Sequence, residues 1–322
     1  MSDRAPDTSN EQRRALEAGL RRVLRALGPY LADLVLIGGW VPYLHRRYGG
    51  IERWNAELSF TSELDVLVAT GRLDARERPP LADLLRQAGL RPASNPYGSA
   101  TGAAVWTAAD DGSTAIEFLV PHTGPLRSRN PPVAVRGQQG IAPLMLTDLG
   151  ILERHTMFLQ VPLEERAAIA LQDGGGSDDR ASVRVPRLGA YVLNKAMTFP
   201  RRTPRSGERV NPKRAKDLLY LRDIVAAGPR VTNIVRADVE HILATDPIAQ
   251  HAVDAAVSSL EFAAAGAYAE DIDRAATMLV EREPDRSWGG ARQDIEGYLT
   301  DCLEILRPFR SPEPEDAIGD LE

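Results

Sequence analysis

Three carboxylates in apolar, strand-like segments are suited to binding a divalent cation. Glu63 and Asp65 are separated by one leucine at the start of ELDVLVA, and Glu117 interrupts the apolar segment AIEFLVP. Residues two apart in a strand point to the same face, so Glu63 and Asp65 would repel each other unless a cation bridges them. If the strand of Glu117 is their neighbour, the three would bind Mg²⁺ or Mn²⁺ as phosphoryl or nucleotidyl transfer requires. The alternative is that they lie on solvent-exposed edge strands.

Two glycines, Gly38 and Gly39, end the apolar run LADLVLIGG and precede a predicted helix at residues 40–48. A strand that ends in Gly-Gly before a helix lets backbone amides approach a phosphate at the positive end of the helix dipole. The sequence WVPYL that follows excludes a G-x-G-x-x-G dinucleotide motif, and it lacks the Gly-Lys-Ser/Thr of a P-loop. A simple tight turn is the alternative interpretation.

The lysines are concentrated in one short part of the chain. Of 39 basic residues, only Lys195, Lys213 and Lys216 are lysines. Lysine is a compact cation often used to bind phosphate, so this grouping favours a phosphate-binding region. Lys195 lies in an apolar helix-like segment, where the alternative is an amine that extends to solvent. Asp217 follows Lys213 at the i, i+4 spacing of a helical ion pair.

The segment between these lysines, RRTPRSGERVNPKR, is rich in arginine. A basic, flexible segment beside a metal site would suit a triphosphate or an RNA backbone. A solvated charged loop is the alternative. The arginines concerned are Arg201, Arg202, Arg205, Arg209 and Arg214.

The composition is that of an ordinary globular protein. The chain has 322 residues and a net charge of −6, which argues against a general nucleic-acid coat protein but allows a local basic groove. Its one cysteine, Cys302, excludes disulfides within one chain, cysteine zinc sites and iron–sulfur clusters. The sequence contains no apolar run of about 20 residues, which a membrane helix needs, and its polar N-terminus is unlike a signal peptide. We therefore expect a cytoplasmic protein that does not act on a membrane.

Hydrophobic periodicity divides the chain into an α/β part and a helical part. Predicted strands end at Gly38 and cover residues 63–69, 103–108 and 114–121, with a hairpin turn at 110–113 and further short strands between 131 and 186. From Leu188 the pattern becomes helical, with two helices followed by two or three alanine-rich helices that end near Phe309. Predicted helices in the first part cover residues 10–27, 40–48 and the segment from Leu81 to Gly89.

Together these motifs resemble the DNA polymerase β-type nucleotidyltransferase superfamily. Its signature is an apolar strand, Gly-Gly or Gly-Ser, a helix, a strand with two acids separated by one apolar residue, and a later strand with a third acid. In this chain the matching motifs are LIGG (36–39), ELD (63–65) and IEF (116–118). The C-terminal half resembles the AbiEii/MenT-related branch, in which a helical lysine precedes an arginine-rich segment and a Lys-Asp-Leu helix. The resemblance covers about residues 30–225.

The resemblance implies an α/β (α+β) fold: a nucleotidyltransferase-like mixed sheet with flanking helices, followed by a C-terminal helical domain. The expected divisions are an N-terminal helix at 1–28, a nucleotidyltransferase-like domain at 29–187, a helical domain at 188–310 and a disordered acidic tail at 311–322.

The resemblance also implies transfer of a nucleoside monophosphate from a nucleoside triphosphate to an acceptor hydroxyl. Glu63, Asp65 and Glu117 would bind Mg²⁺ or Mn²⁺, and Glu117 would alternatively act as general base. Lys195 would contact phosphates, and Asp217 would orient Lys195 or the nucleotide. The expected nucleotide-binding residues are Gly38, Gly39, Thr61, Ser62, Lys195, Lys213 and Lys216.

The acceptor and the partners stay open at this point. A tRNA 3′ end, a protein hydroxyl and a small molecule such as an aminoglycoside are the candidate acceptors, and a toxin-like member would have a cognate antitoxin. The superfamily usually has aspartate as the first acid, where this chain has Glu63. A nucleotide- or RNA-binding module that has lost its chemistry is therefore the alternative.

Overall fold

The computed structural model describes most of the chain in two compact units, Met1–Tyr191 and Val192–Glu322. In the part that it describes, no helix is both long and apolar enough to cross a membrane. The described residues are 10–51, 54, 58, 61, 63–69, 73, 77–93, 102–109, 114–122, 138, 140–164, 179–202 and 211–312.

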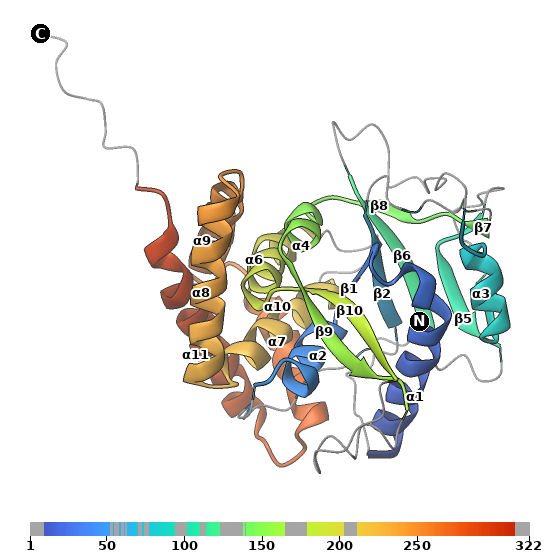
Figure 1. The fold of residues 1–322 in the computed structure, drawn as a ribbon. Helices are drawn as coiled ribbons and strands as arrows, with labels where there is room; N and C mark the ends of the chain where they lie inside the picture. Colours follow the sequence, from blue (N-terminus) through green and yellow to red (C-terminus); the bar gives the residue numbers. More distant parts are fainter. Residues whose placement is uncertain are drawn as a thin grey trace, which may run out of the picture. The chain divides into compact units, whose positions relative to one another are not determined.

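The first unit is built on a mixed sheet whose strand order is β1-β2-β6-β5-β3 (Figure 1). Strand β2 pairs antiparallel with β1 and parallel with β6, and β5 pairs antiparallel with both β6 and β3. A further strand, β8 (Leu144–Leu146), pairs parallel with the C-terminal half of β6. The predicted mixed sheet is confirmed. The strands on its main path are β1 (Leu34–Ile37), β2 (Glu63–Val68), β3 (Leu90–Pro92), β5 (Val105–Ala108) and β6 (Ala115–Pro121).

Three of the four helices described around this sheet lie where the sequence predicts them, whereas the fourth, at 150–154, falls in a segment predicted to hold short strands. The longest is α1 (Asn10–Leu27), which continues into the 3₁₀ turn η1 (Gly28–Tyr30). Helix α2 (Trp40–Tyr48) follows β1, α3 (Leu81–Gln87) precedes β3, and the short α4 (Gly150–Arg154) precedes β9. The predicted hairpin turn at 110–113 lies outside the described residues.

Two smaller pairs of strands complete the first unit. Strands β9 (Thr156–Pro162) and β10 (Arg180–Pro186) form an antiparallel pair, and β10 lies beside β1. Strands β4 (Gly102–Ala103) and β7 (Gly140–Ile141) form a short parallel pair. Of the short strands predicted between 131 and 186, the apolar segment IAPLML (141–146) is divided between β7 and β8.

The core of the first unit explains why β2 and β6 place polar side chains on one face. All residues of β1 are buried, as are Leu64 and Ile116, which are neighbours in the pairing of β2 with β6. Because side chains alternate along a strand, residues next to Leu64 and Ile116 point to the opposite face. That face carries partly buried carboxylates at the start of β2 and in β6.

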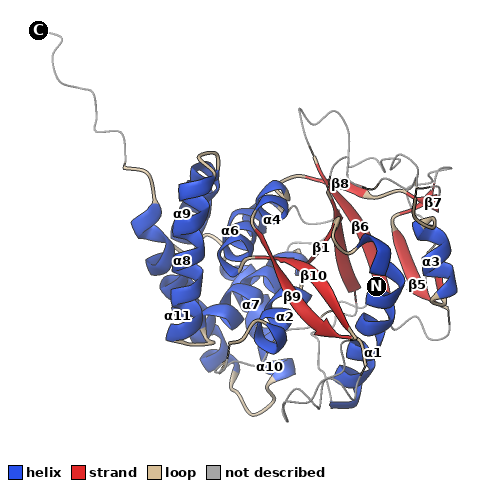
Figure 2. Cartoon of the chain, in the orientation of Figure 1, coloured by secondary structure: helices blue, strands red, loops and turns tan. Residues whose placement is uncertain are grey.

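The second unit is helical in its described residues, and all of the described strands lie in the first unit (Figure 2). Helix α11 packs on α7, α9 and α10, and buried apolar side chains line these contacts. The division between the two units falls within α6 (Leu188–Thr198), which begins at the predicted residue. The remaining elements are η2 (Phe199–Arg201), α7 (Pro212–Val225), α8 (Pro229–Thr245), α9 (Ala249–Ala264), α10 (Ala269–Arg282), α11 (Trp288–Leu306) and η3 (Arg307–Phe309).

The prediction of two or three alanine-rich helices after α7 is wrong, because the structure has α8, α9, α10 and α11 there. Local breaks explain the difference. Asp246 precedes a proline, Gly266 has a φ of +86° between α9 and α10, and the Ser287 side chain caps the start of α11. Residues 313–322, which include most of the predicted acidic tail, and residues 1–9 lie outside the described residues.

Candidate functional site

Strands β2 and β6 bring Glu63, Asp65 and Glu117 together. Asp65 and Glu117 are direct neighbours in the parallel pairing of the two strands, and Glu63 lies two residues earlier on the same face as Asp65. One potential ligand atom from each carboxylate lies within 4.8 Å of the others, and all three residues are partly buried. The structure therefore places the three predicted acids in one cluster, which we call the carboxylate cluster.

Gly38 lies against this cluster, and its residue type is required there for two reasons. Its φ is +74°, a conformation that side-chain-bearing residues rarely adopt. A Cβ atom on Gly38 would also lie 1.9 Å from Asp65 Oδ2 and 2.8 Å from Asp65 Cγ. The Gly-Gly turn thus allows the Asp65 carboxylate to pack directly against the backbone at the end of β1.

The same turn leads into the N-terminus of α2. Gly39 is the N-cap residue and makes no side-chain cap, while the Val41 amide reaches the Gly38 carbonyl at 3.3 Å. Amide groups in the first turn of a helix lack intrahelical acceptors and favour anions. The predicted phosphate-binding glycines therefore lie beside the carboxylate cluster at a helix N-terminus.

Of the two hydroxyl residues that precede β2, the structure describes only Thr61. Thr61 Oγ1 donates a hydrogen bond to the Glu63 carbonyl at 2.9 Å, which closes the turn that leads into the strand. Ser62 lies outside the described residues. A role for either hydroxyl in nucleotide binding stays a prediction.

In the second unit, Lys195 and Asp217 form a buried ion pair between α6 and α7. Lys195 Nζ lies 2.7 Å from Asp217 Oδ1, and Arg202 Nε donates to Asp217 Oδ2. The Lys195 amine also lies 5.2 Å from the centroid of the Tyr220 ring. Lys195 is 7% exposed, so its amine is held inside the unit by these contacts and does not extend to solvent as a surface lysine would.

The charges around Asp217 keep its carboxylate ionised. Burial is the largest single influence and would by itself raise the pKa of Asp217, which is 2% exposed. The positive charges of Arg202 and Lys195, with their hydrogen bonds, outweigh burial and lower the pKa of Asp217 below its usual value. Asp217 is thus a fixed anion shared by two cations.

The other predicted basic residues divide between exposed and structural positions. Lys213 is exposed in the first turn of α7 and Lys216 is half-buried. The spacing allows Lys213 to pair with Asp217, but the structure pairs Asp217 with Lys195 and Arg202 instead. Arg201 is exposed, and Arg205 and Arg209 lie outside the described residues.

Arg214 belongs to the packing of the second unit and not to a solvated loop. Its guanidinium lies 3.2 Å from Asp271 Oδ2 and donates to the Pro200 carbonyl at 3.0 Å. It also lies over the Tyr268 ring at 5.8 Å. These contacts fix the segment η2, which lies between Lys195 and Arg202.

Comparison with known families decides how these residues are interpreted. A family model described as Nucleotidyltransferase matches residues 17–231, which is two thirds of the chain. The chain belongs to the nucleotidyltransferase family. The matched region includes the Gly-Gly turn, the carboxylate cluster, Lys195 and Asp217. Comparisons with curated proteins and with solved structures give no match.

The carboxylate cluster of this nucleotidyltransferase fits a divalent metal. Three carboxylates within 4.8 Å supply hard oxygen ligands, which Mg²⁺ and Mn²⁺ prefer. Glu63 has one methylene more than aspartate, yet its carboxylate reaches the other two. The presence of glutamate at the first acidic position therefore does not remove it from the cluster.

Sequence reasoning missed two contacts that shape the nucleotidyltransferase. The pairing of Arg202 with Asp217 joins residues 15 positions apart, and no local spacing signals it. The second missed contact is the close approach of α1 to the sheet. The signal in the sequence that could have revealed it is Gly19, a glycine in the middle of that helix. Glycine is unfavourable inside helices, so its presence there indicates a close contact.

Proposed function

We propose that this nucleotidyltransferase transfers a nucleoside monophosphate from a nucleoside triphosphate to an acceptor hydroxyl, with Mg²⁺ or Mn²⁺ bound by Glu63, Asp65 and Glu117. The convergence of these carboxylates within 4.8 Å supports the proposal most strongly. Like charges gathered in a partly buried place repel one another, and a divalent cation relieves that repulsion. When bound, the metal would stabilise negative charge on the reacting phosphate.

The residues around the cluster have separate roles in this proposal. Amides of the Gly38-Gly39 turn and the N-terminus of α2 bind the triphosphate, together with the hydroxyls of Thr61 and Ser62. Glu117 is a metal ligand, or it accepts the proton of the acceptor hydroxyl as a general base. The acceptor oxygen forms a bond to the α-phosphorus while the bond from that phosphorus to pyrophosphate breaks.

The lysines extend nucleotide binding in this proposal. Lys195 contacts phosphate, and Asp217 orients its amine through the 2.7 Å contact. Lys213, which is exposed, and Lys216, which is half-buried, add positive charge at the start of α7. We assign these residues to the helical domain at 188–310 and the acids to the nucleotidyltransferase domain at 29–187.

The acceptor follows from the sequence resemblance to the AbiEii/MenT-related branch. We propose a tRNA 3′ end as the first acceptor to test, in a cytoplasmic protein with a toxin-like role and a cognate antitoxin. The arginine-rich sequence between Lys195 and Lys216 supports a polyanionic acceptor through its exposed Arg201, since Arg202 and Arg214 form ion pairs within the second unit. A small-molecule acceptor such as an aminoglycoside is the second one to test.

The test measures transfer of a label from α-phosphate-labelled nucleoside triphosphates to total tRNA, to the protein itself and to aminoglycosides, with Mg²⁺ or Mn²⁺. We expect the wild-type chain to label one acceptor and Asp65→Ala to abolish labelling. Asp301→Ala is the matched control, because Asp301 is an exposed aspartate in α11, outside the matched family region. Labelling that survives Asp65→Ala would refute the assigned site. Nucleotide binding without transfer to any acceptor would favour the degenerate binding module instead.

A further inference from the structure

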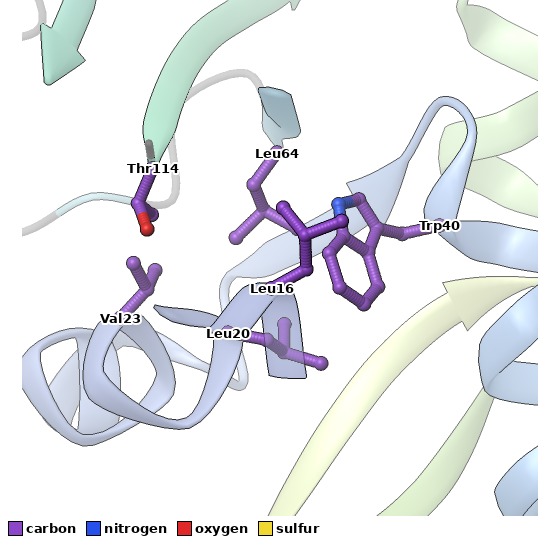
Figure 3. Close-up of a pocket in the computed structure, with 6 residues that line it drawn as sticks. All are labelled: Leu16, Leu20, Val23, Trp40, Leu64 and Thr114. Carbon is purple, nitrogen blue, oxygen red and sulfur yellow. The ribbon is translucent and has the colours of Figure 1, made fainter. Parts of the chain in front are cut away.

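Helix α1 packs on the face of the sheet opposite the carboxylate cluster. None of the predicted site residues lies in this helix. Leu16, Leu20 and Val23 of α1 face Trp40, Leu64 and Thr114 across a small, mainly apolar cavity (Figure 3). Trp40 directly follows the Gly-Gly turn, and Leu64 lies between Glu63 and Asp65. Residues within or next to the segments that carry the acids and the glycines therefore line one cavity with the same face of α1.

Thr114 connects this face to Glu117. The Thr114 carbonyl accepts a hydrogen bond from the Ala108 amide at 2.8 Å, so Thr114 is fixed at the start of β6, three residues before Glu117. Its side chain is buried, with 6% exposed. A displacement of Thr114 therefore moves the start of the strand that carries the third acid.

Helix α1 lies very close to Thr114 at Gly19. A Cβ atom on Gly19 would lie 2.3 Å from Thr114 Oγ1, 3.3 Å from its Cγ2 and 3.4 Å from its Cβ. The first distance is well below any normal contact, so only glycine allows α1 to lie this close. Glycine in a helix interior costs about 1 kcal/mol relative to alanine, and the close packing accounts for its use here.

A polar contact fixes α1 to the helix after the Gly-Gly turn as well. Tyr43 of α2 donates a short hydrogen bond to the Glu17 carboxylate, and Arg21 lies 2.9 Å from the same carboxylate. Burial, followed by the interaction with Glu17, raises the pKa of Tyr43, so its hydroxyl remains a donor at neutral pH. Helix α1 thus contacts α2, lines a cavity with Leu64 of β2, and lies close to Thr114 just before β6.

We propose that Gly19 and Thr114 are positioning residues of the metal site. Their contact fixes the position of β6 relative to β2, and this position sets the distance of Glu117 from Glu63 and Asp65. The inference rests on the proposed metal site. Groups that orient ligands from behind typically change metal affinity by about tenfold or more when they are altered. Gly19→Ala would press Thr114 outwards and separate the third carboxylate from the first two.

The geometry provides a compensating substitution. Thr114→Ala removes Oγ1 and Cγ2 and leaves the Cβ atom, which lies at an ordinary contact distance of 3.4 Å from an alanine at position 19. The double variant Gly19→Ala/Thr114→Ala should therefore restore the spacing. Gly297→Ala is the matched control, because Gly297 is an exposed glycine within α11 whose added Cβ would meet nothing within 4 Å.

The experiment titrates the full-length variants with Mn²⁺ and measures free Mn²⁺ by electron paramagnetic resonance, with thermal unfolding recorded in parallel. We expect Gly19→Ala to weaken Mn²⁺ binding by about tenfold, and the double variant to return to within about twofold of wild type. Gly297→Ala should bind as wild type does. A purely structural role for Gly19 would lower the unfolding temperature of the metal-free protein but leave the affinity of the folded protein unchanged.

Two outcomes would overturn the inference, and they differ from failure of the proposed function. If wild type binds Mn²⁺ in an Asp65-dependent manner but folded Gly19→Ala binds equally well, only the positioning role is refuted. If Gly19→Ala does not fold, Thr114→Ala supplies the test, since it removes the contact without a clash, and an affinity equal to wild type refutes the role. If wild type shows no Asp65-dependent binding, the metal site itself is refuted and the positioning role with it.

Discussion

The two units use buried carboxylates in opposite ways. In the first unit, Glu63, Asp65 and Glu117 gather around one another, with ligand atoms within 4.8 Å. In the second unit, Asp217 is shared by Lys195 and Arg202, and Asp223 is shared by two arginines. Carboxylates matched by cations stabilise a fold without further help, whereas carboxylates gathered together repel one another and so favour the binding of a cation. This difference is why we propose the carboxylate cluster, and not the Asp217 or Asp223 pairs, as the metal site.

In the network around Asp223, buried carboxylates and arginines are paired with one another. Arg282 binds both oxygens of Asp223, at 2.8 and 2.9 Å, and Arg222 lies 2.8 Å from Asp294 and 3.2 Å from Asp223. Burial alone would lower the pKa of Arg282, but the Asp223 charge outweighs it and the pKa is raised. These contacts join α7, α10 and α11, so they account for the packing of the helical unit.

The largest effect is expected from Asp65→Asn. Transfer should fall by about a thousandfold, because stabilisation by a bound metal supplies several kcal/mol. The free energy of unfolding should change by no more than about 1 kcal/mol, since the substitution also removes a mutual repulsion. Steady-state transfer rates and urea unfolding of the same preparations measure both. A large loss of stability with unchanged transfer per folded molecule would show that Asp65 has a structural role and not a role in transfer.

Asp223→Ala should show the opposite pattern. Breaking a buried ion pair by removing one partner costs about 3–5 kcal/mol, because Arg282 is left buried without its main partner. We expect a lower free energy of unfolding in urea and, in the molecules that remain folded, Mn²⁺ affinity equal to wild type. Asp301→Ala is the control for an exposed aspartate in the same unit. A change of less than about 1 kcal/mol at Asp223 would contradict the structural role assigned to it.

Gly38→Ala separates backbone strain from damage to the cluster. Its control is Gly50→Ala, because Gly50 has a similar φ of +68° but its added Cβ would meet nothing within 4 Å. Both substitutions should cost about 1–2 kcal/mol in stability from the left-handed conformation. Only Gly38→Ala should also weaken Mn²⁺ binding, by about tenfold, since its Cβ would displace Asp65. Equal Mn²⁺ affinities in the two variants would show that the Gly38 contact does not position Asp65.

The smallest effect near neutral pH is expected for the pH dependence of the contribution that Asp217 makes to the free energy of unfolding. Its pKa is lower in the folded chain than the usual value of 3.8, so its contribution to stability is complete above that value and is lost as pH falls through the folded pKa. Wild type should lose this contribution only in acid, and Asp217→Asn should lack it at every pH. Urea unfolding across the acidic range measures the difference. A difference between the two proteins that grows above pH 6 would contradict this linkage.

The carboxylate cluster could be predicted from the sequence because the alternation of side chains between the two faces of a strand depends only on local residue order. Glu63 and Asp65 share a face whatever their neighbours are, and Glu117 stands out because it interrupts an apolar run. The antiparallel pairing of β1 with β2, which brings Gly38 against Asp65, depends on sheet order and could not be inferred from spacing. Helix propensity and periodicity located α1 but not Thr114, the residue just before β6 that α1 approaches.

The helical unit was less predictable for a related reason. Its alanine-rich helices are separated by short breaks, such as the one at Gly266, that resemble tolerated residues within a single helix. Asp217 could be paired with Lys213 on spacing alone, but tertiary packing gave it two partners from α6 and the segment that follows. Long-range ion pairs leave no periodic signal in the sequence.

The most direct test of the central claim is the effect of Mn²⁺ on the free energy of unfolding. A cation that binds only the folded protein stabilises it by about 2.7 kcal/mol at a hundred times its dissociation constant. We predict that wild type is stabilised in proportion to the logarithm of Mn²⁺ concentration, and that Asp65→Asn and Glu117→Gln are not. Equal stabilisation of all three proteins, or none of wild type, would contradict a metal site at the carboxylate cluster.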